Sequence, residues 1–220
     1  MGMKRKRQLS SVIFHAGACI LGFFMIYPLL WLLASSFKSN ETMFTNTYSL
    51  LPEVWDAAKN YASGFAGIGG VAFSTFFMNS MVVTVVGTVT CVLSSLLAAY
   101  TFSRLKFRFS NFWFGCVMMT MMIPAQVMVV PQYIILKKIH LIDTRVALVL
   151  PWCFGGAFFI FLMVQFFQGI PKELDEAAEI DGCGKIQTLV RVLIPIVRPA
   201  IITSSIFAFY WIWQDFFQPL

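Results

Sequence analysis

Charged residues, histidines and paired cysteines are scarce in this sequence of 220 residues. Charged side chains make up 12% of the chain and hydrophobic ones 59%, whereas a soluble domain is about one quarter charged. The two histidines lie far apart, and no two of the five cysteines have the spacing of metal ligands. The composition therefore excludes a soluble domain and offers no residues from which a metal centre can be built. The net charge of +6 is not by itself evidence of nucleic-acid binding.

Motifs of enzymes and of nucleotide binding are also absent from the sequence. There is no G-x-x-x-x-G-K-S/T loop to hold phosphates. There is also no set of serine, histidine and aspartate, or of cysteine and histidine, that would form a nucleophilic site. We therefore expect a protein that is not an enzyme. If it performs energy-driven work, the energy must come from another chain.

Long hydrophobic runs dominate what is present. The mean hydropathy is +0.78, and continuous apolar segments of about 20 residues are typical of membrane-spanning helices rather than of a membrane barrel. We predict an all-α, polytopic bundle of transmembrane helices with five spans. The expected spans are residues 12–34, 73–102, 112–135, 146–168 and 196–214.

The polar connections between these spans predict the orientation of the chain. They comprise a basic, cytoplasmic N-terminus (1–11), an external segment (35–72), a cytoplasmic loop (103–111), an external loop (136–145), a cytoplasmic loop (169–195) and an external end (215–220). In this orientation most basic residues lie on the inner side, as the positive-inside rule requires. Five of the 16 basic residues lie outside, namely Lys38, Lys59, Lys137, Lys138 and Arg145.

A charged segment over residues 171–199 interrupts the apolar pattern and must lie in water. Five of the ten acidic residues of the chain fall within it. We predict a short first helix here, with Leu174, Ala177 and Ala178 on one face because they follow helical spacing. Gly182 is placed to end that helix at a positive φ.

A second, amphipathic helix is predicted directly after the first. Its apolar stripe would consist of Ile186, Leu189, Val190, Leu193 and Ile194. The small alanine face of the first helix can enter a groove on a partner protein at close range. A solvated connector between two spans is the alternative interpretation.

Several segments together resemble the permease subunits of ABC importers. Glu176-Ala177-Ala178, followed by Asp181-Gly182 and by Pro195, resembles the cytoplasmic E-A-A-x-x-D-G loop of that family. Further segments resemble its carbohydrate, maltose-type branch. They are Ser35-Ser36-Phe37-Lys38, Asn79-Ser80, Ala98-Ala99-Tyr100 with Ser103-Arg104, Met122-Ile123-Pro124 with Pro131, Ile170-Pro171-Lys172-Glu173-Leu174 and Trp213-Gln214-Asp215-Phe216.

The resemblance implies a non-catalytic translocation subunit in the cytoplasmic membrane of a bacterium. In such importers two permease subunits form the pore, two cytoplasmic ATPase subunits bind ATP and Mg²⁺, and an extracytoplasmic binding protein delivers the sugar. The implied partners are therefore these proteins and membrane lipid, with no nucleic acid and no cofactor on this chain. The residues that the resemblance places against the ATPase are Glu173, Leu174, Glu176, Ala177, Ala178, Asp181 and Gly182.

Two features depart from the family pattern. Gln214 stands where the family usually has asparagine. The family also has a sixth span after this point, so we expect that the last span is missing from this chain and that the chain is shortened. Two alternatives stay open: a permease of the same kind for another small solute, and a truncated scaffold subunit without transport activity.

Overall fold

The computed structural model describes residues 3–45, 49–52 and 55–216. Within those ranges the regular structure is helical, apart from one isolated β-bridge between Ile68 and Val71. The chain divides into two compact units, residues 1–76 and 77–220, which we describe separately. The all-α class that the sequence predicts is confirmed.

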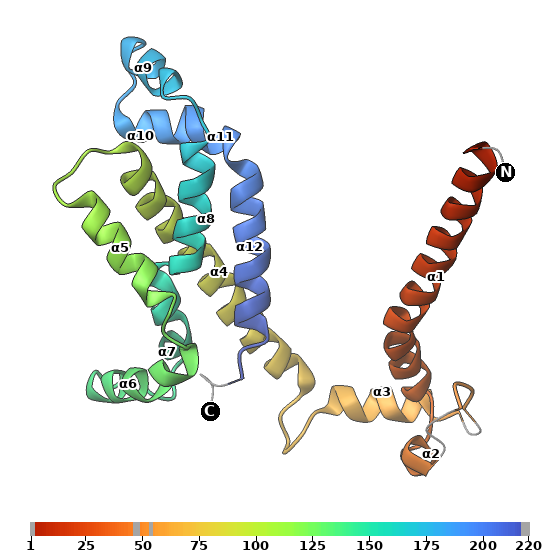
Figure 1. Ribbon diagram of the computed structural model, residues 1–220. Helices are drawn as coiled ribbons and strands as arrows, with labels where there is room; N and C mark the ends of the chain where they lie inside the picture. Colours follow the sequence, from red (N-terminus) through yellow and green to blue (C-terminus); the bar gives the residue numbers. More distant parts are fainter. Residues whose placement is uncertain (1–2, 46–48, 53–54, 217–220) are drawn as a thin grey trace. The chain divides into compact units, whose positions relative to one another are not determined.

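The first unit holds one long helix and two short ones (Figure 1). These are α1 (Met3–Ser35), α2 (Asn40–Thr45) and α3 (Ala57–Ala66), and the unit ends within the first turn of α4 (Phe73–Arg104). The apolar side chains of α1 are exposed along its length, as expected of a helix that contacts lipid.

The segment that we expected to be an external loop, residues 35–72, contains α2 and α3. Asn60 joins α3 to the turn that follows α1. The Nδ2 atom of Asn60 donates to the carbonyl oxygens of Ser36, at 3.1 Å, and of Lys38, at 2.7 Å. The glycines of this segment led us to expect a loop. The sequence did not reveal that the amide of Asn60 would donate to two carbonyls of the turn.

The second unit contains most of α4 and every later helix. After α4 come α5 (Ser110–Thr120), α6 (Ala125–Lys138), α7 (Arg145–Val149), the 3₁₀-helix η1 (Leu150–Phe154) and α8 (Ala157–Gln168). The remaining helices are α9 (Glu173–Ile180), α10 (Lys185–Thr188), the π-helix η2 (Leu189–Leu193), α11 (Ile194–Ile196) and α12 (Arg198–Trp213).

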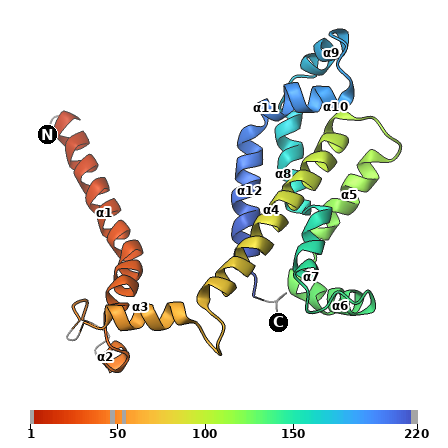
Figure 2. The same cartoon turned by 180° about the vertical axis from the view of Figure 1, so that it is seen from behind.

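The core of the second unit lies between α4, α8 and α12, which run side by side in both views (Figures 1 and 2). It closes at one end with η2, which lies across the ends of α4 and α8. Its members are Cys91, Val92, Leu96, Ala99, Tyr100, Phe159, Ile160, Met163, Val164, Phe167, Ile170, Leu189, Leu193, Val197 and Ala208. The η2 residues in this core join the charged segment to the helix bundle.

Three helical stretches are long and apolar enough to cross a membrane. They are Arg7–Ser35, Phe73–Arg104 and Arg145–Gln168. Two bent pairs, Ser110–Thr120 with Ala125–Lys138 and Lys185–Ile196 with Arg198–Trp213, pass the same test when each pair is counted as one span. The described residues thus allow between three and five crossings, and five is the number predicted.

The span expected over residues 112–135 is not a straight helix. It consists of α5 and α6, whose axes meet at 101°. Met121 and Met122 close the end of α5 with short-range bonds to the carbonyls of Met118 and Met119. Pro124, which has no N–H to donate, then precedes α6. The interruption therefore lies at the first proline of this segment.

The second helix of the charged segment buries only part of its predicted stripe. Leu189 and Leu193 are buried, whereas Ile186 and Val190 are exposed. The buried row continues to Val197 at four-residue spacing, and this row faces the core. The helix contains a π-helical turn before Pro195, which cannot donate a helical bond to Arg191.

Candidate functional site

The candidate site is the charged segment at one end of the second unit, where α9 projects beyond α10 and α11 (Figure 1). Helix α9 begins at Glu173, and the carbonyl of Lys172 accepts the N–H groups of Asp175 and Glu176 at 2.9 and 3.2 Å. Pro171 therefore precedes the helix. Three acidic residues occupy the first turn, where the helix dipole stabilises negative charge.

Gly182 ends α9 as the sequence predicts. Its φ is +79°, a conformation that favours glycine because it has no Cβ. The Gly182 N–H donates to the carbonyl of Glu179 at 3.0 Å, and the Cys183 N–H donates to that of Ala178 at 2.9 Å. This pair of bonds is a Schellman motif. The turn between α9 and α10 is thus defined by backbone geometry.

The predicted apolar face of α9 is divided between two sides of the helix. Ala178 is buried, and it is the one buried residue of α9. Ala177 and Leu174 are exposed instead. Glu176 lies on the exposed surface with them. The surface of α9 that is free for a partner is therefore acidic and apolar together, while Ala178 serves the packing of this chain.

Asp175 is the acidic residue of α9 that turns back toward the bundle. Its Oδ2 lies 2.9 Å from Nη1 of Arg104, the last residue of α4. The side chains are 24% and 5% exposed, respectively. Nη2 of Arg104 also donates to the carbonyl oxygens of Phe167, at 2.7 Å, and of Ile170, at 2.8 Å. One guanidinium therefore joins the end of α4 to the end of α8 and to α9.

Tyr100 makes a second contact, one turn before Arg104 on α4. Its hydroxyl donates to the backbone carbonyl of Lys185, the first residue of α10, at 2.9 Å. We call Tyr100 and Arg104 the α4 anchor. The sequence placed both in the family resemblance and counted Arg104 among the basic residues of the inner side, but it did not predict these contacts. Their four-residue spacing, which puts both on one face at the end of an apolar helix, was the available signal.

The charged segment has a further ion pair, at its surface. Nζ of Lys185 lies 3.2 Å from Oε2 of Glu179, and these side chains are 62% and 68% exposed. An exposed pair of this kind contributes little to stability, because water screens both charges. It differs in this respect from the buried contact between Arg104 and Asp175, where removal of one partner leaves a poorly solvated charge.

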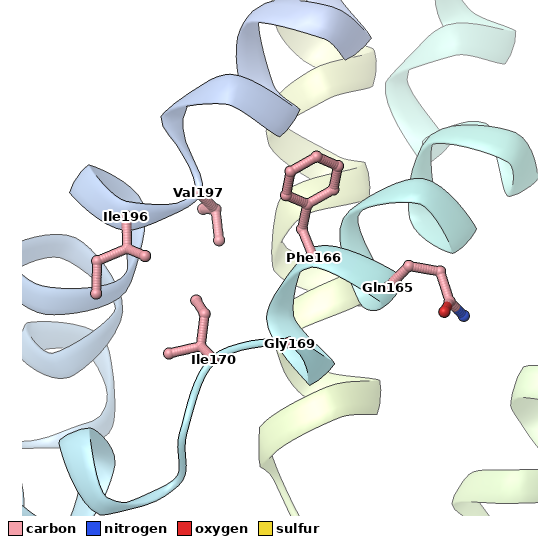
Figure 3. A pocket seen from close by; sticks show the side chains of 6 residues that line it. All are labelled: Gln165, Phe166, Gly169, Ile170, Ile196 and Val197. Carbon is pink, nitrogen blue, oxygen red and sulfur yellow. The ribbon is translucent and has the colours of Figure 1, made fainter.

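A shallow cavity of about 410 Å³ lies next to this region, between the end of α8 and the bend from α11 to α12. Figure 3 shows the side chains of Ile170 and Val197 directed toward each other across it, and the Gln165 amide directed away. The bend between the two helix axes is 79°. Ile170, which lines the cavity, is also one of the two residues whose carbonyls accept hydrogen bonds from Arg104.

Comparison with known proteins identifies the family. Residues 91–220 match the family described as "Binding-protein-dependent transport system inner membrane component". The chain belongs to this family. The match covers the candidate site and the whole α4 anchor, and it confirms the resemblance to ABC importer permeases that the sequence motifs indicate.

Curated relatives agree with this assignment over most of the chain. The chain is 35% identical over 86% of its length to "Probable ABC transporter permease protein YurM" of Bacillus subtilis (strain 168), of which it covers 62%. It is 36% identical over 64% of its length to "Probable ABC transporter permease protein PH1036" of Pyrococcus horikoshii, of which it covers 52%. The chain therefore spans between half and two thirds of the length of these two permeases.

The same fold occurs in a solved transporter. A chain from the structure titled "Crystal structure of a bacterial ABC transporter involved in the import of the acidic polysaccharide alginate" superimposes with a TM-score of 0.81. The sequences are 24% identical, and the alignment covers 96% of this chain and 73% of the other. This likeness shows that the helix arrangement is that of an ABC importer permease.

In the part of the chain that the structure describes, no three histidine, cysteine, aspartate or glutamate residues are grouped so that they could hold a metal ion. The site therefore consists of backbone turns, acidic side chains and one buried arginine. Its exposed part is the acidic and apolar surface of α9.

Proposed function

We propose that this chain is the permease subunit of an ATP-driven importer for carbohydrates, and that α9 is its contact with a cytoplasmic ATPase subunit. The observation that carries the proposal is the position of α9. The helix projects from the bundle, exposes Glu176 and Ala177, and is joined through Arg104 to two helices of the bundle. A docking helix needs this combination of an open surface and a firm attachment.

The ATPase site belongs to the partner in this proposal. ATP and Mg²⁺ bind on the partner subunits, because this sequence has no phosphate-binding loop. Closure of the ATPase subunits moves α9, and the bundle changes between inward-facing and outward-facing states. A second permease subunit completes the pore. The N-terminus and α9 lie on the cytoplasmic side, as the distribution of basic residues favours.

Carbohydrate is the proposed substrate class because several similar permeases are named for the sugars that they transport. The chain is 30% identical to "Diacetylchitobiose uptake system permease protein NgcG" of Streptomyces coelicolor, and covers 68% of it. It is 31% identical to "Probable starch degradation products transport system permease protein AmyC" of Thermoanaerobacterium thermosulfurigenes, and covers 77% of it. An extracytoplasmic binding protein would deliver the sugar to this chain and its partner permease.

Reversal of one charge on α9 tests the proposed contact. Glu176→Arg places a cation on the exposed surface of α9 without disturbing a buried group, so the chain should still insert in the membrane. We expect the amount of ATPase subunit that copurifies with the chain to fall about tenfold, since one close charge reversal at an interface changes affinity by 1.4 kcal/mol or more. The measurement is quantitative mass spectrometry of the purified complex.

Glu41→Arg is the matched control for this experiment. Glu41 is also an exposed acid in the first turn of a short helix, but it lies in α2. Copurification should be unchanged in this variant. Equal recovery of the ATPase with Glu176→Arg and with the unaltered chain would refute α9 as the contact.

A further inference from the structure

The attachment of α9 to its own chain neighbours is weak. On one side, residues 169–172 lead to it from α8, and on the other side Gly182 and Gly184 flank the turn to α10. Within α9 only Ala178 is buried. Packing thus ties the helix to the bundle through one small buried side chain.

Arg104 supplies a connection that bypasses both turns. It belongs to α4, yet its guanidinium forms an ion pair with Asp175 in α9 and donates hydrogen bonds to the carbonyls of Phe167, in α8, and Ile170, just after α8. A planar guanidinium can hold several acceptors at once in a fixed geometry, which a lysine ammonium cannot. With 5% of its side chain exposed, Arg104 is screened little by solvent, so its attraction to Asp175 is weakened less than that of an exposed pair.

Tyr100 adds a contact of the same kind one turn away. Its hydroxyl bonds the carbonyl of Lys185, so the start of α10 is also held by α4. The ring of Tyr100 packs against Phe167, with centroids 6.1 Å apart. Both helices of the charged segment are therefore attached to a single face of α4, which is itself 32 residues long.

We infer that Arg104 is a positioning residue that transmits the displacement of α9 directly to α4. The inference rests on the proposed function, because it takes α9 as the element that the ATPase moves. Asp175 is the receiving group on α9, and its inward direction separates it from the exposed Glu176. In this inference Asp175 contacts Arg104 within the chain, while the neighbouring Glu176 contacts the ATPase subunit.

Hydrogen exchange on the complete transporter tests this connection. The complex is purified with its ATPase subunits and trapped with MgATP and vanadate, and amide exchange is compared with the nucleotide-free complex. In the unaltered protein we expect trapping to change exchange in α9 and at the end of α4. With Asp175→Asn or Arg104→Gln, the change at the end of α4 should fall roughly tenfold, a typical size for coupling between two sites.

Three further variants separate transmission from folding. Arg104→Lys keeps the charge but loses the branched geometry, so its effect should be intermediate. The double variant Arg104→Gln with Asp175→Asn should be no worse than Arg104→Gln alone, because Arg104→Gln already removes the ion pair that Asp175→Asn removes. Lys185→Gln breaks the exposed pair with Glu179 and should leave the exchange response unchanged.

Two results would overturn the inference. One is a response at the end of α4 that is the same in Arg104→Gln and in the unaltered complex. The other is loss of the ATPase subunits from both Arg104→Gln and Asp175→Asn, which would make Arg104 a residue that folds the docking surface. Failure of the proposed function has a different signature, since trapping would then change exchange in no part of α9, even in the unaltered complex.

Discussion

At the scale of single residues, the turn after α9 contains two glycines whose backbone conformations differ. Gly182 has φ +79°, whereas Gly184 has φ −71° and ψ 164°. A Cβ added to either glycine would meet no atom within 4 Å. Any difference between alanine variants at these two positions therefore reports backbone conformation and not crowding.

We expect Gly182→Ala to destabilise the turn by about 1–2 kcal/mol, the strain of a left-handed alanine. Gly184→Ala should cost less than this, because its φ suits any residue and the loss is only that alanine is a poorer N-cap than glycine. Hydrogen exchange of the Gly182 and Cys183 amides, which form the Schellman bonds, measures both variants. Equal exchange in the two would contradict the role of the positive φ.

The difference between Gly182 and Arg104 shows what sequence reasoning could reach at this scale. The end of a helix is a local property, and a glycine after an alanine-containing helix predicts it. The partners of Arg104 lie 63, 66 and 71 positions further along the chain, at Phe167, Ile170 and Asp175. The positive-inside rule already explains a basic residue at the end of a membrane helix. The sequence therefore gave no reason to expect that Arg104 also contacts distant residues.

At the scale of elements, the junction between η1 and α8 is fitted closely to α4. The Gly156 N–H donates to the hydroxyl of Ser95 at 3.1 Å, in a region where Ser95 is fully buried. Gly155 has φ +81°, and a Cβ there would lie 3.1 Å from the Ser95 hydroxyl oxygen. The helix is thus interrupted where small residues allow two backbones to approach, and a hydroxyl satisfies a freed N–H.

Gly155→Ala should destabilise the bundle by about 1–3 kcal/mol, from the left-handed strain together with overpacking against Ser95. Gly115→Ala is the control, because Gly115 lies inside α5 and a Cβ there would meet no atom within 4 Å. Its alanine should stabilise α5 by about 0.5–1 kcal/mol. The midpoint of thermal unfolding in detergent measures both, and a lower midpoint for Gly115→Ala than for Gly155→Ala would contradict this account.

Sequence patterns predicted which segments are helical better than they predicted how those helices bend and which of their faces are buried. A proline pair indicated an interruption in residues 112–135, and the break lies at Pro124 while Pro131 lies inside α6. The size of the bend could not be predicted, because it depends on the helices against which α5 packs. The stripe over residues 186–194 was predicted only in part for a related reason, since Leu189 and Leu193 are buried while Ile186 and Val190 are exposed. Helical spacing identifies neighbours on a surface, but only the bundle decides which row it covers.

At the scale of the whole molecule, many large hydrophobic side chains are exposed on the surface of the chain. Large hydrophobic side chains are exposed along α1 and along the outer sides of α4 and α12, and these surfaces suit lipid or a second permease subunit. The apolar fraction of 59% indicated a membrane protein, because it exceeds that of typical soluble domains, and the length of the continuous apolar runs indicated helices. The direction of insertion is a separate property that depends on the charged loops.

Reporter fusions measure that direction. Alkaline phosphatase, which is active only outside the cytoplasm, should be inactive when fused after Arg108 and active when fused after Ile142. A fluorescent protein that folds in the cytoplasm should show the opposite pattern. The expectation follows from the excess of basic residues in the loops placed inside. Phosphatase activity at Arg108 would reverse the orientation and would move α9 away from any cytoplasmic ATPase.

The bend between α5 and α6 has a consequence for how the protein is made. Helix α5 has 11 residues and α6 has 14, so they extend about 16 Å and 21 Å at 1.5 Å per residue. Neither is long enough for a hydrocarbon layer of about 30 Å. We therefore expect neither helix to insert as a span by itself, and the pair can cross the membrane only as one unit, with α5 packed against α8.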